Sequence, residues 1–223
     1  MTPRPRRYLF LSLLGTCLFA VLAVLVATDS ALVRLDTRLV TALHQFAVDH
    51  VAVHDFFVFV TNLGTDQPLW YVGAVAVLML VLRRWWFPAL VWTGGLLVSS
   101  YVTGWLKPQF GRVRPPFANI EGFSFPSGHA FASAAVYGML ALAILRVFHR
   151  YRWRWALAGA LWVWIGLVAV SRPLLGVHYP SDVLAGMCLG LAWGFYWAAL
   201  ADWWDLRRMR GNAERVEQTQ DPA

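Results

Sequence analysis

The sequence predicts an all-α, polytopic membrane protein, a bundle of six transmembrane helices. Hydrophobic residues make up 59% of its 223 residues and charged residues only 14%, whereas soluble domains usually carry about 25% charged residues. The chain also contains 13 Trp, and aromatic rings of this kind favour membrane interfaces. Apolar runs of membrane-spanning length recur along the chain, and its length suits a single domain.

Six segments are long and apolar enough to span a membrane, which takes about 20 mostly apolar residues. They are Tyr8–Ala27, Asp66–Leu82, Trp85–Leu106, Ala130–Phe148, Trp155–Val170 and Val183–Trp204. The first follows Arg4, Arg6 and Arg7, as the apolar part of a signal peptide would. Because its apolar run of about 20 residues exceeds the ~7–15 of a signal peptide, we interpret it as an uncleaved first helix.

The basic residues are distributed unevenly among the predicted connections. Thirteen of the 19 Lys and Arg lie in the N-terminal tail, the second-to-third turn, the fourth-to-fifth turn and the C-terminal tail. The positive-inside rule then places both termini in the cytoplasm and the other three connections outside. Because the basic residues form short clusters between apolar runs, the formal net charge of +7 does not indicate a nucleic-acid partner.

Two segments lie outside the predicted spans of the domain, which covers residues 1–206. In the first outward connection, about 29–65, apolar residues recur at helical spacing: Leu32, Leu35, Leu39, Leu43 and Phe46. This pattern predicts an amphipathic helix on the outer membrane surface or against the bundle. The connection also contains three histidines that we interpret as interfacial or surface residues: His44, His50 and His54. Residues 207–223 are polar and aperiodic, so we expect a disordered cytoplasmic tail.

Two outward connections hold residues suited to chemistry. They are Lys107–His129, "KPQFGRVRPPFANIEGFSFPSGH", and Ser171–Asp182, "SRPLLGVHYPSD". Together they contain three cations, two histidines and one carboxylate: Lys107, Arg114, Arg172, His129, His178 and Asp182. A single Lys at a helix end can simply extend to the interface. Three cations beside two imidazoles, on one face of the membrane, instead predict a pocket for a multiply charged anion such as phosphate.

The segment Pro126–His129 adds hydrogen-bond donors to this pocket. Ser127 can cap the helix that follows, and Gly128 lets the backbone approach a ligand closely. The free N–H groups at the helix start and the helix dipole then attract an anion. Such a cap is common, so this segment alone also fits a purely structural role.

His178 and Asp182 are four residues apart at the expected start of the sixth helix. The carboxylate can therefore reach one imidazole nitrogen and leave the other free for nucleophilic attack. Ser127 and Ser171 are competing nucleophiles, although neither lies in a nucleophile-elbow context.

The two connections resemble the motifs of the type 2 phosphatidic acid phosphatase superfamily, which also contains vanadium haloperoxidases and bacterial acid phosphatases. The first motif, Lys, six residues and Arg-Pro, is matched by Lys107 and Arg114-Pro115. The second, Pro-Ser-Gly-His, is matched by Pro126–His129. The third is matched in full by Ser171-Arg172, His178 and Asp182. The motifs extend over residues 107–182, and the connection 29–65 carries no signature of the family.

The resemblance implies a role for each matched residue. His178 would attack phosphorus and form a phosphohistidine, Asp182 would orient it, and His129 would protonate the leaving oxygen and later help to activate water. The remaining matched residues would bind the phosphate oxygens: Lys107, Arg114, Ser127, Gly128 and Arg172. Arg112, between motif positions, is expected as an auxiliary phosphate contact. The chemistry requires no metal or other cofactor, since the cations supply the positive field.

The resemblance further implies an enzyme of a bacterial cell membrane with a lipid phosphate or diphosphate as substrate. Similar bacterial proteins act on undecaprenyl diphosphate, phosphatidylglycerol phosphate, phosphatidic acid or the 1-phosphate of lipid A, and the short chain with compact loops favours the first. Phosphotransferase activity and a vanadate-holding haloperoxidase are alternatives. A transporter or binding protein is disfavoured, because the charges lie at one rim rather than along a path through the membrane.

Overall fold

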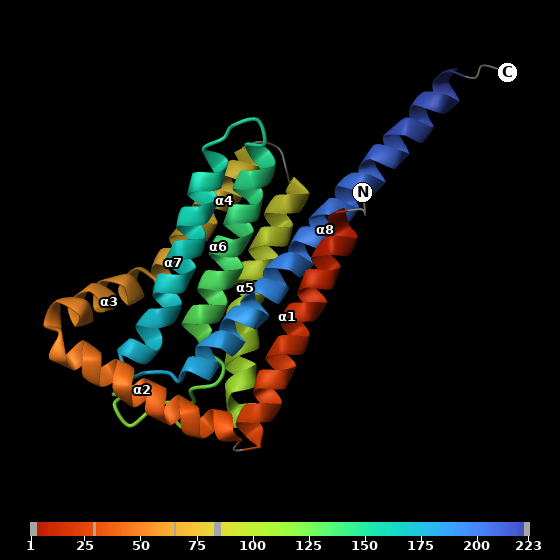
Figure 1. Ribbon diagram of the computed structural model, residues 1–223. Helices are drawn as coiled ribbons and strands as arrows, with labels where there is room; N and C mark the ends of the chain where they lie inside the picture. Colours follow the sequence, from red (N-terminus) through yellow and green to blue (C-terminus); the bar gives the residue numbers. More distant parts are fainter. Residues whose placement is uncertain (1–3, 29, 65, 83–85, 221–223) are drawn as a thin grey trace.

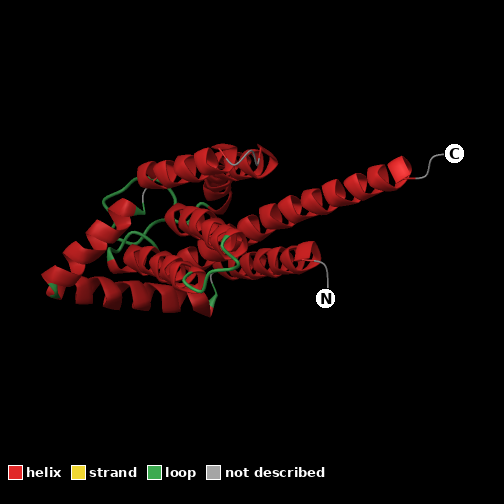
Figure 2. Cartoon of the chain, turned by 90° about the horizontal axis from the view of Figure 1, so that it is seen from above, coloured by secondary structure: helices red, strands yellow, loops and turns green. Residues whose placement is uncertain are grey.

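The computed structural model describes residues 4–28, 30–64, 66–82 and 86–220. The described residues form eight helices and no strand: α1 Arg4–Ala27, α2 Ala31–Asp49, α3 Val51–Leu63, α4 Asp66–Leu82, α5 Trp86–Phe110, α6 Gly128–Val147, α7 Arg154–Leu174 and α8 Pro180–Gln220. Figure 2 shows the same chain as helices joined by loops. The predicted all-α class is therefore confirmed.

The bundle consists of the helices that coincide with the six predicted spans (Figure 1). Among the described residues, four helices are long and apolar enough to cross a membrane, namely α1, α6, α7 and α8, and the bent pair α2–α3 would add a fifth if counted as one span. α4 has only 17 residues, and α5 is interrupted by Gly, Ser and Thr. The outer surface of α1 is apolar, with Phe10 65% and Leu13 62% exposed, as expected of a helix that contacts lipid. The chain is a membrane protein, and the full count of six spans stays a prediction.

Glycines bring α8 very close to α6. A Cβ added to Gly190 would lie 2.3 Å from the backbone oxygen of Phe131, and one added to Gly186 would lie 2.4 Å from that of Ser127. Small residues at such spacing let two membrane helices pack backbone to backbone. The start of α6, which carries Ser127 as its N-cap, is thereby fixed against the start of α8.

The connection 29–65 contains two helices, α2 and α3, which meet at an angle of 111°. α2 crosses one end of the bundle (Figure 1). The apolar residues at helical spacing lie in α2, but Leu35, Leu39 and Phe46 point outward and are 41–50% exposed. The face against the bundle instead carries Asp36, Val40 and Ala47. The sequence did not indicate α3, because its run VAVHDFFVFVTNL is apolar on nearly every side and has no clear period.

α8 differs from the expectation at its C-terminal end. It extends to Gln220, so the polar segment from residue 207 onward is helical as far as the structure describes it, whereas its polar, aperiodic sequence predicts a disordered tail. After Pro180 the sequence has no helix-breaking proline before Pro222. In Figure 1 this part of α8 projects beyond the bundle.

The two connections singled out by the sequence lie at the same end of the bundle. The loop 111–127, the turn 175–179 and α2 are together at the lower end in Figure 1, whereas both chain termini lie toward the opposite end. The helices thus bring residues far apart in sequence to one rim.

Candidate active site

The loop between α5 and α6, residues 111–127, is held in shape by its own hydrogen bonds. Ser124 donates to the carbonyl oxygen of Arg112 from its backbone N–H at 2.8 Å and from its hydroxyl at 3.2 Å. At the far end of the loop, the backbone N–H of Ser127 donates to the carbonyl oxygen of Asp182 at 3.0 Å. The second motif is thereby tied to the first turn of α8, which carries the end of the third motif.

The turn between α7 and α8, residues 175–179, depends on Gly176. Its φ is +67°, a conformation that glycine adopts without strain. A Cβ at this position would lie 2.8 Å from Phe117 and 2.9 Å from Nδ1 of His44. His44 also stacks on Phe117, with ring centroids 4.5 Å apart, and pairs through Nδ1 with the carbonyl oxygen of Leu174 at 3.2 Å. His44, expected at the interface or surface, is therefore a half-buried support of this turn.

His178 and Asp182 form the pair that their spacing predicts. His178 is 1% exposed and Asp182 is 0% exposed. α8 begins at Pro180, so Asp182 lies in the first turn, and its Oδ2 is 3.4 Å from Nδ1 of His178, long for a hydrogen bond. The same oxygen accepts the backbone N–H of Tyr179 at 2.9 Å. Because Nδ1 faces the carboxylate, the arrangement favours the tautomer with hydrogen on Nδ1 and a lone pair on Nε2.

Arg114 lies beside the free nitrogen of His178. Its Nη1 is 3.3 Å from Nε2 of His178 and donates to the carbonyl oxygen of Val177 at 3.0 Å. Its Nε donates to the carbonyl oxygen of Gly122 at 3.2 Å. The guanidinium is thus fixed by backbone acceptors next to the atom from which a nucleophilic attack would start.

Arg172, in the last turn of α7, is buried with 5% exposure. Its Nη1 donates to the hydroxyl of Thr61 on α3. Its Nε is buried and has no hydrogen-bond partner among the described residues. An unsatisfied donor on a buried cation is unfavourable unless a ligand completes it, so Arg172 is suited to hold an anion.

His129 and Lys107 complete the cluster. His129 lies half-buried in the first turn of α6, and Lys107 lies in the last turn of α5. Four groups lie within electrostatic range of His129: Arg172, His178, Lys107 and Arg114. The structure therefore brings together the cations and imidazoles of all three motifs.

The two serines considered as nucleophiles have other partners. The Ser127 hydroxyl caps α6 by accepting the backbone N–H of Ala130 at 3.5 Å. The Ser171 hydroxyl donates to the carbonyl oxygen of Val168, one turn earlier in α7, at 2.7 Å. Both serines are 0% exposed, and these geometries favour histidine as the nucleophile.

Arg112 occupies a different position from the one expected of an auxiliary phosphate contact. Its guanidinium forms ion pairs with Asp182 and with Asp36 of α2, so its nitrogens already have anionic partners. Sequence reasoning did not predict Asp36 or Thr61, both of which lie in the connection without family motifs. For Asp36 a signal existed, because it shares a helix face with Val40 and Ala47, and a carboxylate on the buried face of a helix needs a partner.

Burial and neighbouring cations keep His178 neutral. Removal from water lowers the pKa of His178 from 6.5 to about 4, the carboxylate of Asp182 opposes this shift, and Arg172 and Arg114 reinforce it. A neutral imidazole retains the lone pair that nucleophilic attack requires. The site therefore combines a nucleophile that is unprotonated at neutral pH with cations that attract an anion.

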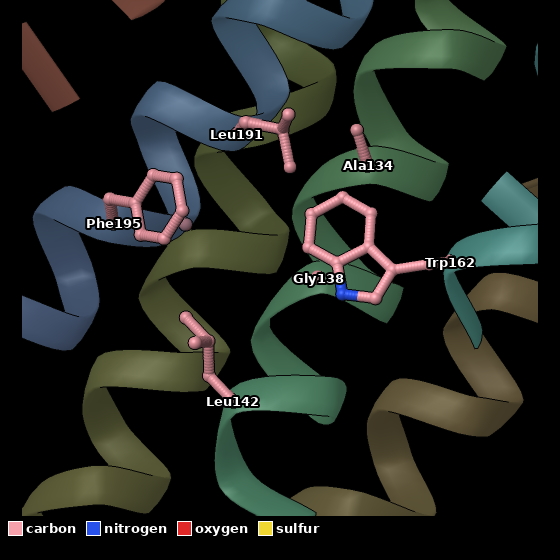
Figure 3. A pocket seen from close by; sticks show the side chains of 7 residues that line it. Ala134, Gly138, Leu142, Trp162, Leu191 and Phe195 are labelled. Carbon is pink, nitrogen blue, oxygen red and sulfur yellow. The ribbon is translucent and has the colours of Figure 1, made fainter. Parts of the chain in front are cut away.

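A separate apolar hollow lies deeper between α6, α7 and α8 (Figure 3). Its lining includes Ala134, Trp162, Leu191 and Phe195. None of its lining residues is titratable, so the hollow offers no acid, base or nucleophile. The candidate active site is the polar cluster at the rim.

Comparison with known proteins shows the class to which this fold and site belong. Residues 88–205 match the PAP2 superfamily, which is more than half of the chain and includes all three motifs. The protein belongs to the PAP2 superfamily and is a phosphatase, as its relatives are.

Particular relatives differ in their named substrates. The chain is 32% identical to phosphatidylglycerophosphatase B of Bacillus subtilis over 59% of this chain and 67% of that protein. It is 31% identical to decaprenylphosphoryl-5-phosphoribose phosphatase of Mycobacterium tuberculosis over 77% of this chain and 85% of that protein. It is 35% identical to lipid A 1-phosphatase of Rhizobium johnstonii over 46% of this chain, a match that spans only 45% of that protein.

The fold is also that of a solved structure. The crystal structure of a transmembrane PAP2-type phosphatidylglycerolphosphate phosphatase from Bacillus subtilis superposes with a TM-score of 0.72 at 26% identity. The superposition covers 88% of this chain and 96% of that chain. The helical arrangement is thus shared over most of the molecule, a larger part of the chain than the residues 88–205 matched by the family.

Proposed function

We propose that this protein removes phosphate from a membrane lipid through a phosphohistidine on His178. The observation that carries the proposal is the geometry of the third motif. Nδ1 of His178 faces the buried carboxylate of Asp182 at 3.4 Å, while Nε2 faces the guanidinium of Arg114 at 3.3 Å. This arrangement supports attack by Nε2 on a phosphorus atom whose oxygens are held by the neighbouring cations.

The reaction has two steps. In the first, Nε2 of His178 forms a bond to phosphorus as the bond from phosphorus to the leaving oxygen breaks, and His129 gives a proton to that oxygen. In the second, water attacks phosphorus while His129 takes a proton from the water, the phosphorus–nitrogen bond breaks and inorganic phosphate leaves. Asp182 stabilises the positive charge that the imidazole acquires on attack.

The cations stabilise the negative charge on the phosphate oxygens. Arg172 offers its buried, unpartnered Nε, and Arg114 exchanges its contact with His178 for one with the phosphate. Lys107 adds charge from the last turn of α5. Ser127 and Gly128 start α6, whose first backbone N–H groups and dipole favour an anion. Because these cations and the start of α6 supply the positive field, we expect activity to survive EDTA, and we expect vanadate to inhibit by occupying the phosphate position.

The orientation that we propose places the rim with the active site outside the cell membrane of a bacterium. The basic residues are concentrated in the tails and turns of the opposite end, which the positive-inside rule assigns to the cytoplasm. Glu121→Cys at an exposed position of the loop, in a protein whose Cys17 and Cys188 are replaced by Ser, should react with a membrane-impermeant thiol reagent added to intact cells. Reaction only after the cells are opened would contradict this orientation.

The substrate that we propose is undecaprenyl diphosphate, which would yield undecaprenyl phosphate and inorganic phosphate. The compact chain supports this assignment, as does a 34% identical relative from Sulfolobus acidocaldarius named undecaprenyl-diphosphatase, matched over 42% of this chain. Phosphatidylglycerol phosphate is the second candidate. It is favoured by the solved relative, which superposes over 88% of this chain and is titled as a phosphatase of that lipid.

A panel of four lipids in detergent micelles tests both parts of the proposal. The purified protein is given undecaprenyl diphosphate, phosphatidylglycerol phosphate, phosphatidate or lipid A, and the release of inorganic phosphate is measured. The lipid with the highest kcat/KM identifies the substrate, and a preference for any of the other three overturns our assignment. Transfer of phosphate to an added lipid alcohol, rather than release, would identify a phosphotransferase.

His178→Gln is the matched control in the same panel. It should abolish phosphate release from every lipid and leave no ³²P on enzyme that is denatured at alkaline pH, where a phosphohistidine survives, because the variant lacks the attacking nitrogen. If His178→Gln retains substantial phosphate release, the phosphohistidine mechanism is wrong.

A further inference from the structure

Asp36 is a buried carboxylate in the connection that carries no family motif. It lies on α2 and is 1% exposed. Its Oδ2 is 2.8 Å from Nη2 of Arg112. Its Oδ1 accepts the backbone N–H of Ser181 at 3.0 Å, and its Oδ2 accepts the Ser181 hydroxyl. A carboxylate is retained in such a dry position only where partners compensate its lost hydration, and here every partner belongs to the active-site end of the bundle.

Arg112 bridges this carboxylate to the proposed catalytic pair. Its Nη1 is 2.5 Å from Oδ1 of Asp182 and donates to the Ser181 hydroxyl at 2.8 Å. Its guanidinium also lies 4.1 Å from the ring centroid of Tyr179. The side chain is only 9% exposed, so its position is fixed by these contacts. A continuous series of contacts thus extends from Asp36 through Arg112 to Asp182, and from there to His178.

The charges explain why a second carboxylate is useful in this series. Asp182 alone with Arg112 would form a neutral pair, and the negative charge next to His178 would be largely cancelled. Asp36 supplies a second negative charge to the same guanidinium, so Asp182 keeps more of its charge directed at Nδ1 of His178. Asp36 also fixes both polar groups of Ser181, which sets the direction in which the first turn of α8 presents Asp182.

We propose that Asp36 is a positioning residue for phosphoryl transfer and acts on Asp182 through Arg112 and Ser181. This inference rests on the proposed function, in which Asp182 orients His178 for attack. It assigns a catalytic purpose to α2, whose outer face is the exposed apolar stripe of Leu35, Leu39 and Phe46. A residue outside the family motifs is then part of the machinery that aligns the nucleophile.

Asp36→Asn in the full-length protein tests the inference against the four panel lipids in detergent micelles. Asn has nearly the same shape but no charge. We expect kcat to fall about 10- to 100-fold, the range seen when a supporting partner of a functional group is lost, while KM changes little. Asp49→Asn on the same helix is the control, because Asp49 is exposed and accepts only from Gln45 among the described contacts; its kcat should be that of the wild type.

Arg112→Gln and the double variant Asp36→Asn/Arg112→Gln test whether Asp36 positions Asp182 or only docks α2 onto the bundle. If Asp36 acts through Arg112, the double variant should lose no more kcat than the more impaired single variant, since the two residues form one unit. Losses that multiply would overturn the inference, as would wild-type kcat in Asp36→Asn. If Asp36→Asn fails to fold, Arg112→Lys decides. Lys keeps the charge but cannot bridge two carboxylates with separate nitrogens, and an unchanged kcat would overturn the inference.

His178→Gln in the same assay distinguishes a failure of the phosphohistidine mechanism from a failure of the role proposed for Asp36. Activity that survives in His178→Gln overturns the proposed mechanism itself. Loss of activity in His178→Gln together with full kcat in Asp36→Asn overturns only the role of Asp36.

Discussion

Asp182 faces His178 across the first turn of α8, with its Oδ2 3.4 Å from Nδ1 of the imidazole. Both residues are at most 1% exposed, so the pair is removed from water before any substrate arrives. The other carboxylate oxygen, Oδ1, is bound by Arg112 at 2.5 Å. The imidazole is therefore oriented by a carboxylate that is itself held in place.

Asp182→Asn should lower kcat by a factor on the order of 10⁴, the size of effect that follows when an orienting carboxylate is replaced by its amide. The amide has no negative charge to stabilise the imidazolium formed on attack, and it can favour the wrong tautomer of His178. Phosphate release and the rate of ³²P incorporation into the enzyme both measure this step. An Asp182→Asn variant with near wild-type kcat would show that the carboxylate does not assist the attack.

His178 should remain neutral at pH values where an ordinary histidine is protonated. Its pKa is lowered to about 4, so the folded protein should bind no proton at His178 as the pH falls from 7 to 5. An unfolded chain takes up this proton near pH 6.5, and folding stability contributed by neutral His178 is therefore lost as the pH falls from about 6.5 toward 4. NMR titration of ring-labelled histidine, with His178→Gln to assign the signal, measures the pKa, and a midpoint above 6 would contradict the prediction.

Arg172→Lys should lower kcat/KM by about 10²–10³-fold, the range found when one donor to a developing negative charge is removed. Lys has no Nε–H at the position of the unpartnered donor of Arg172, and it cannot donate to Thr61 and phosphate in the same plane. Arg207→Lys is the control, because Arg207 is exposed on α8 and stacks on Trp203 away from the site. Equal kcat/KM values in the two variants would remove Arg172 from the phosphate site.

Gly190→Ala should destabilise the bundle by about 1–3 kcal/mol, a typical result of overpacking. The added Cβ would approach the backbone oxygen of Phe131 to 2.3 Å, which the rigid start of α6 cannot avoid. Gly159→Ala on α7 meets nothing within 4 Å, so it should be neutral or slightly stabilising because alanine favours helices. Thermal unfolding in detergent compares the two, and an unchanged Tm in Gly190→Ala would contradict this account of α6–α8 packing.

The sequence predicted the parts of this site that depend on local spacing. The cap at Ser127, the start of α8 at Pro180 and the reach of Asp182 to His178 each follow from residues within one or two turns of each other. The partners of two arginines could not be predicted in this way, because they are distant in sequence. Asp36 is 76 residues from Arg112, and Thr61 is 111 residues from Arg172. Asp36 on α2 and Thr61 on α3 belong to two helices that meet at 111°, and this arrangement is a property of the tertiary structure.

By itself, the sequence determined the all-α membrane class, the family and the motif residues, because hydropathy, helix caps and four-residue spacing are local properties of the chain. The tertiary structure decided which face of α2 is buried and that His44 supports the turn 175–179. It also decided that Arg112 binds two carboxylates rather than the phosphate. These outcomes depend on packing between distant helices. The apolar stripe of Leu35, Leu39 and Phe46 is helical in either orientation. It faces outward because the opposite face of α2 is held inward by the contacts of Asp36 with Arg112 and Ser181 and by the burial of Val40 and Ala47.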